Sequence, residues 1–487
     1  MKYVLGIDVG TTGTKSALFD SQGSLIDTEY RSYPISYPGE GWAEQDARDW
    51  WNAVVETTRG LVSRRNCSSE VVSMSLSTQG GALVILDDRF NPVYPAVSWL
   101  DTRATEVQEE LTRHISAREL YEMDGWPVTG GLNFPTIFWF RRKLPHVLEK
   151  ASFFASTVDY LNFLLTGNFA IDYTNLALTM FLDLGRRDWS ERALNIAGIN
   201  RNNVARIIPS GKRVGTLTPK AAETLGLSSE VKVVSGAHDQ YCASLGAGAV
   251  EYGDCILSSG TAWVLLATCD RLYYLDQSLE RRRVTSGVFP GLHPLEGKYG
   301  VMTSVPFGGN SLKWFRDVFR PGTSYEQLSQ DASRVPHGCE GLMFVPIASS
   351  ASGKGAFLRI DGVHTVGHFT RAVLEGVAFV NRRHLELIKQ AGVNVRNFIM
   401  TGGGSNSTLW PQIVSDISNV PVFIPELKEA ACAGAALLAG AGAGVFVSLK
   451  EMARRITGKN TKITPQQKNV EMYRELYQDY IKLTEYI

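Results

Sequence analysis

Two segments of the chain, separated by half its length, share one residue pattern. Residues 3–20 read YVLGIDVGTTGTKSALFD, and residues 253–270 read GDCILSSGTAWVLLATCD. Both read as a strand, a Gly-Thr turn and a second strand. At a constant offset of 250 residues, Gly10 matches Gly260, Thr11 matches Thr261 and Asp20 matches Asp270. Two short matches can arise by chance, but the constant offset favours a duplicated domain pair.

The length and the segment pattern agree with two α/β domains. A chain of 487 residues is long enough for roughly two to four domains, and we place a boundary that gives domains 1–245 and 246–487. Amphipathic stretches at 48–62 and 369–388 predict helices. Glycine-bounded apolar runs predict strands at 4–10, 71–77, 82–87, 231–237, 255–260 and 398–404. This mixture predicts sheets covered by helices.

The charge balance and the cysteines restrict the partners and the compartment. The 49 basic and 49 acidic residues cancel, which argues against a nucleic-acid partner. The six cysteines are scattered without a C-x-x-C pair, so we expect free thiols, without disulfides or a zinc site. The chain shows no signal peptide, and we expect a cytoplasmic protein.

Residues 430–449, AACAGAALLAGAGAGVFVSL, carry no charge and are long enough for a membrane span. Small alanine and glycine side chains dominate the segment, and glycine weakens an isolated helix. The composition therefore favours a tightly packed helix followed by a loop, and we expect no membrane partner.

The turn at residues 8–15, DVGTTGTK, has the composition of a phosphate-binding turn. Successive glycines and threonines let backbone N–H groups converge on an anion. Its side-chain donors are Thr11, Thr12, Thr14 and Lys15. Asp8 stands where a strand would deliver a carboxylate to Mg²⁺ or to its waters. An ordinary hairpin with polar turn residues is the alternative.

Two further glycine-containing turns could approach a nucleotide. Ser259-Gly260-Thr261 repeats the first turn, and residues 401–407, TGGGSNS, follow an apolar run. Neither is specific alone, since serine and glycine are common in turns. A P-loop is excluded, because the residues that follow each Gly-Lys pair are Arg213, Tyr299, Gly355 and Asn460. The GAGAG run at 440–444 lacks the strand and helix start of a dinucleotide fingerprint.

The segment GAHDQ, residues 236–240, ends a predicted strand with an acidic residue. A carboxylate at this place can accept the proton of a hydroxyl that attacks phosphorus, which makes Asp239 a candidate base. The alternative is a helix N-cap aspartate. We expect His238 to be a packed neighbour and not a ligand.

In this order the motifs resemble the FGGY carbohydrate kinases along nearly the full chain. The matching segments are DVGTTGTK, GWAEQD at 41–46, VSWLDTR at 97–103, residues 166–190, GAHDQ, SSGTA at 258–262, FGGNSLKW at 307–314, HFTRAVLEG at 368–376 and residues 401–417. GWAEQD and WLDTR look most like the xylulokinase branch. The resemblance implies two tandem actin-like ATPase (ribonuclease H-like) domains with a cleft between them. The implied reaction transfers the ATP γ-phosphoryl group to a hydroxyl of a small open-chain ketose, such as xylulose, or a polyol.

The resemblance also implies roles for residues at matching positions. Asp239 would be the catalytic base, and Asp8 would lie by Mg²⁺. Contacts with ATP would come from Thr11, Thr12, Gly13, Lys15, Gly260, Thr261, Gly309, Lys313, Gly403, Gly404 and Ser407. Contacts with the sugar would come from Gln79, Gly80, Gly81, Trp99, Asp101, Asp239 and Gln240. The expected partners are the sugar and ATP, and a homodimer is possible.

Four positions depart from the family pattern. Gly80 and Gly81 replace the Met-His pair of xylulokinases, so either a bulkier substrate fills the space or a local turn replaces the contacts. Thr136 stands where the family has lysine, and Arg359 where it has glycine. The departures leave two alternatives open: a non-catalytic nucleotide-binding protein, or a kinase for another substrate such as a sugar acid or a deoxy sugar.

Overall fold

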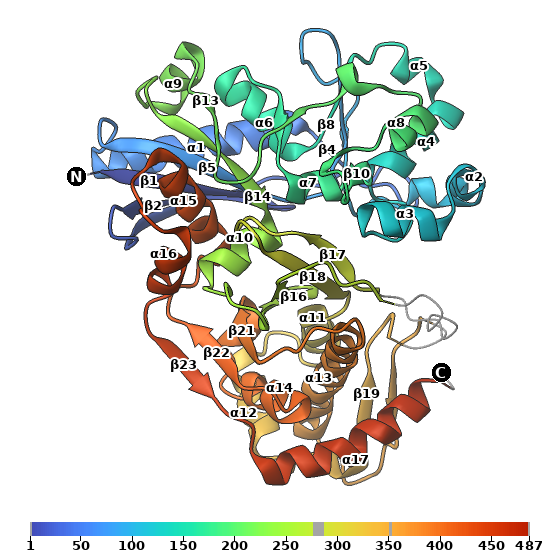
Figure 1. Cartoon of the computed structure of the whole chain (residues 1–487). Coiled ribbons are helices and arrows are strands. Elements are labelled where there is room, and N and C mark those ends of the chain that lie inside the picture. The colour runs from blue at the N-terminus through green and yellow to red at the C-terminus, as the bar shows by residue number, and fades with distance from the viewer. Residues whose placement is uncertain (1, 276–286, 350–352, 486–487) are drawn as a thin grey trace. The chain divides into compact units, whose positions relative to one another are not determined.

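A computed structural model describes residues 2–275, 287–349 and 353–485 (Figure 1). The chain divides into two compact units. Unit 1 comprises Met1–Val250, Pro290–Tyr299 and Glu429–Ile456, and unit 2 comprises Glu251–Phe289, Gly300–Lys428 and Thr457–Ile487. Unit 1 thus contains a late segment of the chain, which carries the Ala/Gly-rich stretch. The domain boundary at residues 245/246 stays a prediction.

The described part of unit 1 contains a six-stranded sheet in the order β13-β14-β5-β1-β2-β3. Strand β1 (Tyr3–Val9) runs antiparallel to β2 (Gly13–Asp20) and parallel to β5 (Val71–Thr78), which in turn runs parallel to β14 (Lys232–His238). The edge strands are β13 (Arg213–Thr216) and β3 (Leu25–Ser32). The predicted hairpin and three of the predicted strands are confirmed.

Both faces of β1 are covered, which explains its nearly continuous apolar sequence. On one face, Leu5, Ile7 and Val9 join a core with Trp50 of α1 (Ala47–Arg65). The alternate residues, among them Gly6, face α15 (Ala430–Ala443), because a Cβ on Gly6 would meet the carbonyl oxygen of Cys432. The helix expected at 48–62 is therefore confirmed as α1.

The Ala/Gly-rich segment forms the 14-residue helix α15, which packs against β1 and against α10 (Asp239–Gly246). A Cβ on Gly434 would meet the carbonyl oxygen of Cys242, and a Cβ on Gly246 would meet that of Ala430. The expectation of a tightly packed helix is confirmed. No helix in the described part of the chain combines the length and the hydropathy that a bilayer span requires.

The second sheet has the order β17-β18-β16-β15-β21-β22-β23. Its hairpin is β15 (Asp254–Ser259) with β16 (Trp263–Cys269), and β15 runs parallel to β21 (Asn397–Thr401). The other strands are β17 (Phe289–Leu292), β18 (Tyr299–Val305), β22 (Val422–Pro425) and β23 (Asn460–Ile463). The run β18-β16-β15-β21-β22-β23 corresponds to β3-β2-β1-β5-β14-β13 of unit 1, which supports a duplicated fold.

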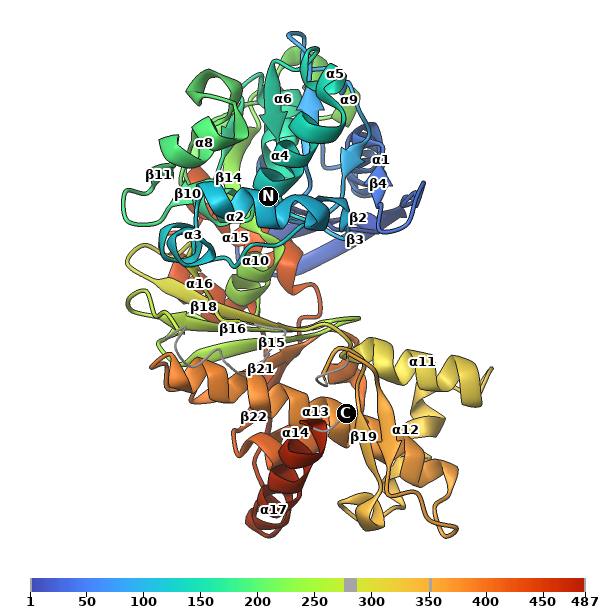
Figure 2. The same ribbon diagram turned by 90° about the vertical axis from the view of Figure 1, so that its right-hand side faces the viewer.

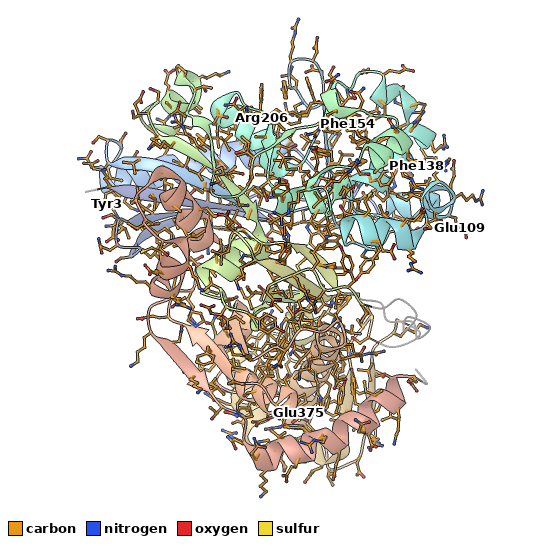
Figure 3. All side chains as sticks on the ribbon, viewed as in Figure 1. Tyr3, Glu109, Phe138, Phe154, Arg206 and Glu375 are labelled. Atoms are coloured by element: carbon orange, nitrogen blue, oxygen red, sulfur yellow. The ribbon has the colours of Figure 1, made fainter. Side chains whose placement is uncertain are left out.

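Helices cover the sheet of unit 2. Helix α13 (Val366–Gln390) and α14 (Trp410–Ser418) lie side by side, and α17 (Gln467–Thr484) packs on α14 (Figure 2). Glu375 of α13 is buried and accepts hydrogen bonds from Arg371 and Tyr473, both at 2.7 Å (Figure 3). The helix expected at 369–388 is confirmed as α13. The unit also contains α11 (Gly309–Phe319), α12 (Tyr325–Ser333), β19 (Met343–Val345) and β20 (Ala356–Leu358).

Shorter elements complete unit 1. The strands are β4 (Glu44–Gln45), β6 (Val84–Leu86), β7 (Ala96–Val97), β8 (Phe153–Ala155), β9 (Ala170–Ile171), β10 (Leu182–Asp183), β11 (Asp188–Trp189) and β12 (Arg206–Ile207). The helices are α2 (Gln108–His114), α3 (Ala117–Asp124), α4 (Asn133–Lys143), α5 (Pro145–Leu148), α6 (Thr157–Thr166), α7 (Tyr173–Ala177), α8 (Glu191–Ala197), α9 (Pro219–Leu225) and α16 (Leu449–Ile456). No disulfide joins the six cysteines, all of which are described and buried.

Candidate active site

The carboxyl ends of three neighbouring parallel strands bring polar residues together in unit 1. Asp8 near the end of β1 is in register with Ser77 of β5, and His238 at the end of β14 is in register with Thr78. Gln79 and Asp239 therefore follow adjacent strands at one edge of the sheet. In α/β sheets this edge is where ligands bind.

Asp8 is an unusually basic carboxylate. Burial first, and then the negative charge of Asp239, raise the pKa of Asp8 to about 7. The hydroxyl of Ser77 donates to Oδ1 of Asp8 at 2.7 Å and acts in the opposite direction, as does the charge of Lys15. A divalent cation at Asp8 would remove the cost of holding this carboxylate ionised.

The donor set at Asp8 fits Mg²⁺. Mg²⁺ usually takes one or two protein carboxylates and completes its shell with water and substrate phosphates. The described residues contain no group of three or more histidine, cysteine, aspartate or glutamate side chains that could cage a metal ion. Asp8 offers one carboxylate, of which Oδ1 already accepts a hydrogen bond from Ser77.

Asp239 is the first residue of α10, and its side chain is 31% exposed. The positive end of the helix favours a negative charge at this place. His238, not Asp239, occupies the N-cap position, so the N-cap alternative for Asp239 is wrong. The expectation of a packed histidine is confirmed, because His238 is buried, and its Nε2 lies 3.0 Å from Oδ1 of Asp239.

Two glutamines near Asp239 present amide oxygens that are buried without a hydrogen-bond partner among the described residues. These atoms are Oε1 of Gln79 and Oε1 of Gln240. Gln79 is only 2% exposed, and its amide nitrogen donates to Oε1 of Gln45 at 3.3 Å. Buried polar atoms normally have partners, so these two oxygens are suited to hydroxyl groups of a ligand.

The first turn is held by side chains from outside the hairpin. The indole of Trp99 donates to Oγ1 of Thr11 at 3.0 Å, and Gln45 donates to the Thr11 carbonyl at 2.9 Å. The backbone N–H of Tyr33 donates to the carbonyl of Thr12 at 3.1 Å, and a Cβ on Gly13 would meet the Tyr30 ring. These contacts fix the conformation of the turn, and its binding of phosphate stays a prediction.

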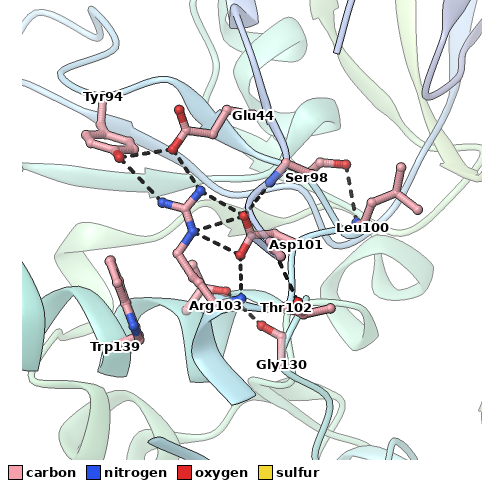
Figure 4. Close-up of polar contacts among 12 residues, drawn as sticks. Glu44, Tyr94, Ser98, Leu100, Asp101, Thr102, Arg103, Gly130 and Trp139 are labelled. Atoms are coloured by element: carbon pink, nitrogen blue, oxygen red, sulfur yellow. Dashed lines mark hydrogen bonds and ion pairs between the residues drawn. The ribbon is translucent and has the colours of Figure 1, made fainter. Parts of the chain in front are cut away.

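Asp101 lies in a buried ion-pair network (Figure 4). Its carboxylate accepts from Nε of Arg103 at 2.9 Å, from Nη2 of Arg103 at 2.8 Å and from the N–H of Ala43 at 2.7 Å. Arg103 also donates to Glu44 at 2.7 Å, and Tyr94 donates to Glu44 at 3.0 Å. At 1% exposure, Asp101 stabilises the loop that carries Trp99, and its predicted contact with a sugar stays a prediction.

Unit 2 contains a pocket of about 640 Å³ beside its own hairpin turn. The pocket gathers all seven residues that the sequence predicts in this unit for nucleotide: Gly260, Thr261, Gly309, Lys313, Gly403, Gly404 and Ser407. The N-terminus of α11 is tied to the turn, because the N–H of Gly309 donates to the Gly260 carbonyl at 3.1 Å. Gly402 adopts φ +84°, and a Cβ there would lie 3.0 Å from the carbonyl carbon of Ser259. Two glycine-containing segments thus approach the turn at residues 259–261 backbone to backbone.

Two family models cover most of the chain. Residues 3–246 match the N-terminal domain of the FGGY family of carbohydrate kinases, and residues 279–443 match the C-terminal domain. The chain belongs to the FGGY family of carbohydrate kinases. It is an ATP-dependent sugar kinase with the duplicated actin-like fold, and the family assignment from sequence motifs is confirmed.

The relatives of the chain carry several kinase names, among them xylulose kinase and gluconokinase. A xylulose kinase of Bacillus subtilis (strain 168) is 31% identical over 99% of this chain and 96% of its own length. A gluconokinase of the same strain is 28% identical over 99% of this chain and 95% of its own length. The crystal structure of xylulose kinase from Rhodospirillum rubrum superposes with a TM-score of 0.88 at 26% identity, covering 99% of this chain and 98% of that one.

Leucine side chains lie close to Gly80 and Gly81, the two glycines at the positions where the resemblance expects the Met-His pair of xylulokinases. A Cβ on Gly80 would meet the side chain of Leu178, and a Cβ on Gly81 would lie 2.5 Å from Cδ2 of Leu132. Gly81 also adopts φ +71°, which other residues rarely do. Leucine side chains thus occupy both Cβ positions, which favours a local turn there, and the expectation of a bulkier substrate stays a prediction.

The other two departures are structural in this chain. Thr136 is buried in α4, where its hydroxyl donates to the carbonyl of Leu132 at 2.8 Å. Arg359 adopts φ +60°, a conformation that suits the expected glycine, and its guanidinium lies 3.3 Å from Asp479 of α17.

Sequence reasoning missed several residues of these sites. Both Ser77 and Glu429 contact residues that are distant in the chain. Ser77 donates a hydrogen bond to Asp8, 69 residues away, and Glu429 accepts one from Lys15 at 2.7 Å, 414 residues away. In unit 2, Tyr325, Glu326, Ser329 and Trp410 also line the pocket. Two sequence signals could have identified these residues. Ser77 stands at the end of a predicted strand, and Glu429 directly precedes the Ala/Gly-rich segment.

Proposed function

We propose that the chain phosphorylates a hydroxyl group of a small, neutral open-chain sugar, such as the ketose xylulose, or of a polyol. The observation that carries this proposal is the position of Asp239 beside the buried, unpartnered oxygens of Gln79 and Gln240. A polyhydroxylated ligand supplies several O–H donors, and the two unpartnered amide oxygens can accept hydrogen bonds from them. The 31% sequence identity to a xylulose kinase supports the same substrate class.

Asp239 acts as the general base of this reaction. One oxygen of its carboxylate accepts the proton of the sugar hydroxyl while the hydroxyl oxygen forms a bond to the γ-phosphorus of ATP. The bond from that phosphorus to the bridging oxygen breaks, and ADP leaves. Nε2 of His238 lies 3.0 Å from Oδ1 of Asp239, and the exposed part of the Asp239 side chain leaves room for substrate.

Asp8 holds Mg²⁺, which neutralises charge on the transferred phosphoryl group when it is bound. Ser77 orients this carboxylate through its 2.7 Å hydrogen bond. Thr11, Thr12, Gly13 and Lys15 contribute backbone and side-chain donors for phosphate.

The pocket of unit 2 binds the nucleotide. Its glycines let the backbone approach the ligand closely, and Lys313 and Ser407 are polar groups on its wall. The ammonium of Lys313 pairs with Asp317 at 2.6 Å, one turn further along α11.

The sugar-side positions favour a neutral substrate over a sugar acid. A carboxylate substrate calls for an arginine or lysine partner, whereas the proposed contacts are Gln79, Gln240, Trp99 and glycine backbone. Arg103, the cation nearest to them in sequence, is committed to Asp101 and Glu44. The gluconokinase relative makes gluconate the alternative substrate to test.

The test is an assay of ADP release with Mg²⁺ and a panel containing D-xylulose, other ketoses, polyols and gluconate. We expect a ketose or a polyol to give the highest kcat/KM. If gluconate is preferred, the neutral-substrate assignment fails, and if no compound exceeds the rate in water, the sugar-kinase proposal fails. In the same assay, Asp239→Asn should lose most of the sugar-dependent rate and retain ATP binding, whereas the exposed control Asp88→Asn should keep both.

A further inference from the structure

The register of the first hairpin sets Lys15 directly opposite Asp8. Cα of Asp8 pairs with Cα of Lys15 between β1 and β2. Side chains that stand opposite each other in an antiparallel pair share one face, with Cβ atoms roughly 5 Å apart. A lysine and an aspartate in this relation are expected to form an ion pair.

The ammonium group of Lys15 instead lies 2.7 Å from Oε2 of Glu429. The side chains of Lys15 and Glu429 are 33% and 25% exposed, so water screens their attraction only in part. Asp8 keeps the hydroxyl of Ser77 as its hydrogen-bond donor. Lys15 is close enough to act on the charge of Asp8, but its ion pair goes to Glu429.

The position of Glu429 is fixed by the packing of the helix that follows it. Glu429 occupies the N-cap position of α15, where its carbonyl accepts from the N–H of Ala433 at 2.9 Å. The helix that follows is pressed against β1 at Gly6 and against α10 at Gly434, with no room for a Cβ at either point. The small residues of α15 therefore fix the distance between the start of the helix and the first hairpin.

We propose that Glu429 is a positioning residue that holds the Lys15 ammonium group away from Asp8 and so keeps Asp8 available to the divalent cation. The inference rests on the proposed role of Asp8 in binding Mg²⁺. Without Glu429, the flexible lysine pairs with the carboxylate across the hairpin. Lysine and divalent cation then compete for one carboxylate.

The experiment measures how strongly a divalent cation increases nucleotide affinity. Calorimetry gives the Kd of a non-hydrolysable ATP analogue with and without Mn²⁺, and the ratio of the two constants reports the coupling. We expect Glu429→Gln to reduce this ratio about tenfold, which is the scale of one charge-assisted hydrogen bond. Glu56→Gln is the matched control, because Glu56 also pairs with a basic side chain, that of Arg31 at 3.1 Å, but on the exposed surface of unit 1.

The double variant Lys15→Met/Glu429→Gln separates positioning from a structural role. Because Lys15 is also a proposed phosphate donor, the double variant is compared with Lys15→Met alone. With the competing ammonium group absent, loss of Glu429 should not lower the ratio further, so these two variants should give the same ratio. A native ratio in Glu429→Gln, or a ratio in the double variant below that of Lys15→Met, overturns the proposal. Since the measurement needs no sugar, its result does not depend on which sugar is the substrate.

Asp8→Asn distinguishes failure of the inference from failure of its premise. We expect this variant to lose the effect of Mn²⁺ on nucleotide affinity. If Asp8→Asn keeps the effect, the proposed role of Asp8 falls and the inference with it. If Asp8→Asn loses the effect while Glu429→Gln keeps it, the inference alone is wrong.

Discussion

Replacement of Asp8 by asparagine should make the metal-free protein more stable at neutral pH. In the native protein, burial and the charge of Asp239 raise the pKa of Asp8 from 3.8 to about 7. Asparagine has nearly the same shape, can still accept the hydrogen bond of Ser77 and carries no charge. The variant therefore avoids the cost of ionising a partly buried carboxylate.

The size of the stability gain and the pH range in which it appears follow from the shift in the pKa of Asp8. The folded state holds the proton of Asp8 more tightly than the unfolded state does, so native stability falls as pH rises from about 4 to about 7. A shift of about 3 units, at about 1.4 kcal/mol per unit, corresponds to about 4 kcal/mol. The gain in unfolding free energy of Asp8→Asn should grow from near zero at pH 4 to this value at pH 8.

Hydrogen exchange in urea, followed by mass spectrometry of peptides from β1 and β5, measures the free energy of opening in unit 1. The measurement is made in EDTA from pH 5 to pH 8, with the exposed control Asp88→Asn expected to match the native protein throughout. A gain that does not change with pH, or a loss of stability at pH 8, would refute the electrostatic reasoning. Mg²⁺ with nucleotide should then stabilise the native protein and not the variant.

Three further substitutions test the packing around the site. Arg103→Met should lower the free energy of unfolding in urea by about 3–5 kcal/mol, because it leaves Asp101 buried without its cation (Figure 4). A change near zero would contradict the stabilising role of this ion-pair network. Gly434→Ala should cost about 1–3 kcal/mol or more, since the added methyl meets the backbone of Cys242, and a wild-type melting temperature would show that α15 can move. Gly81→His should lower stability because of φ +71° without shifting kcat/KM towards D-xylulose; a clear shift would instead show that the missing histidine sets specificity.

Local chemistry explains why the turns and the strand-end carboxylates could be predicted from sequence. Gly10, Gly260 and Gly402 mark sharp turns after apolar strands, and such patterns depend on a few neighbouring residues. Asp8 and Asp239 stand at the ends of two of those strands. The parallel register of β1, β5 and β14 then brings these ends to one edge of the sheet.

Long-range packing explains what the sequence did not reveal. The burial of Asp101 depends on Arg103, which is close in sequence, but also on Ala43 and Glu44 from another loop. The packing beside Gly80 depends on Leu178, nearly a hundred residues later. No local pattern predicts such contacts, so the sequence did not reveal the ion pairs of Asp101 or the leucine beside Gly80.

The composition of the uncharged segment at 430–449 is explained by its packing. Its alanines and glycines lower the bulk of α15 where the helix meets β1 and α10, and burial explains the absence of charge in the helix up to Gly440. The residue directly before the segment, Glu429, is charged and forms an ion pair with Lys15. Close backbone approach and precise placement of one carboxylate are then two consequences of the same packing. A substitution that thickens the helix at Gly434 should accordingly disturb the Lys15–Glu429 pair as well as stability.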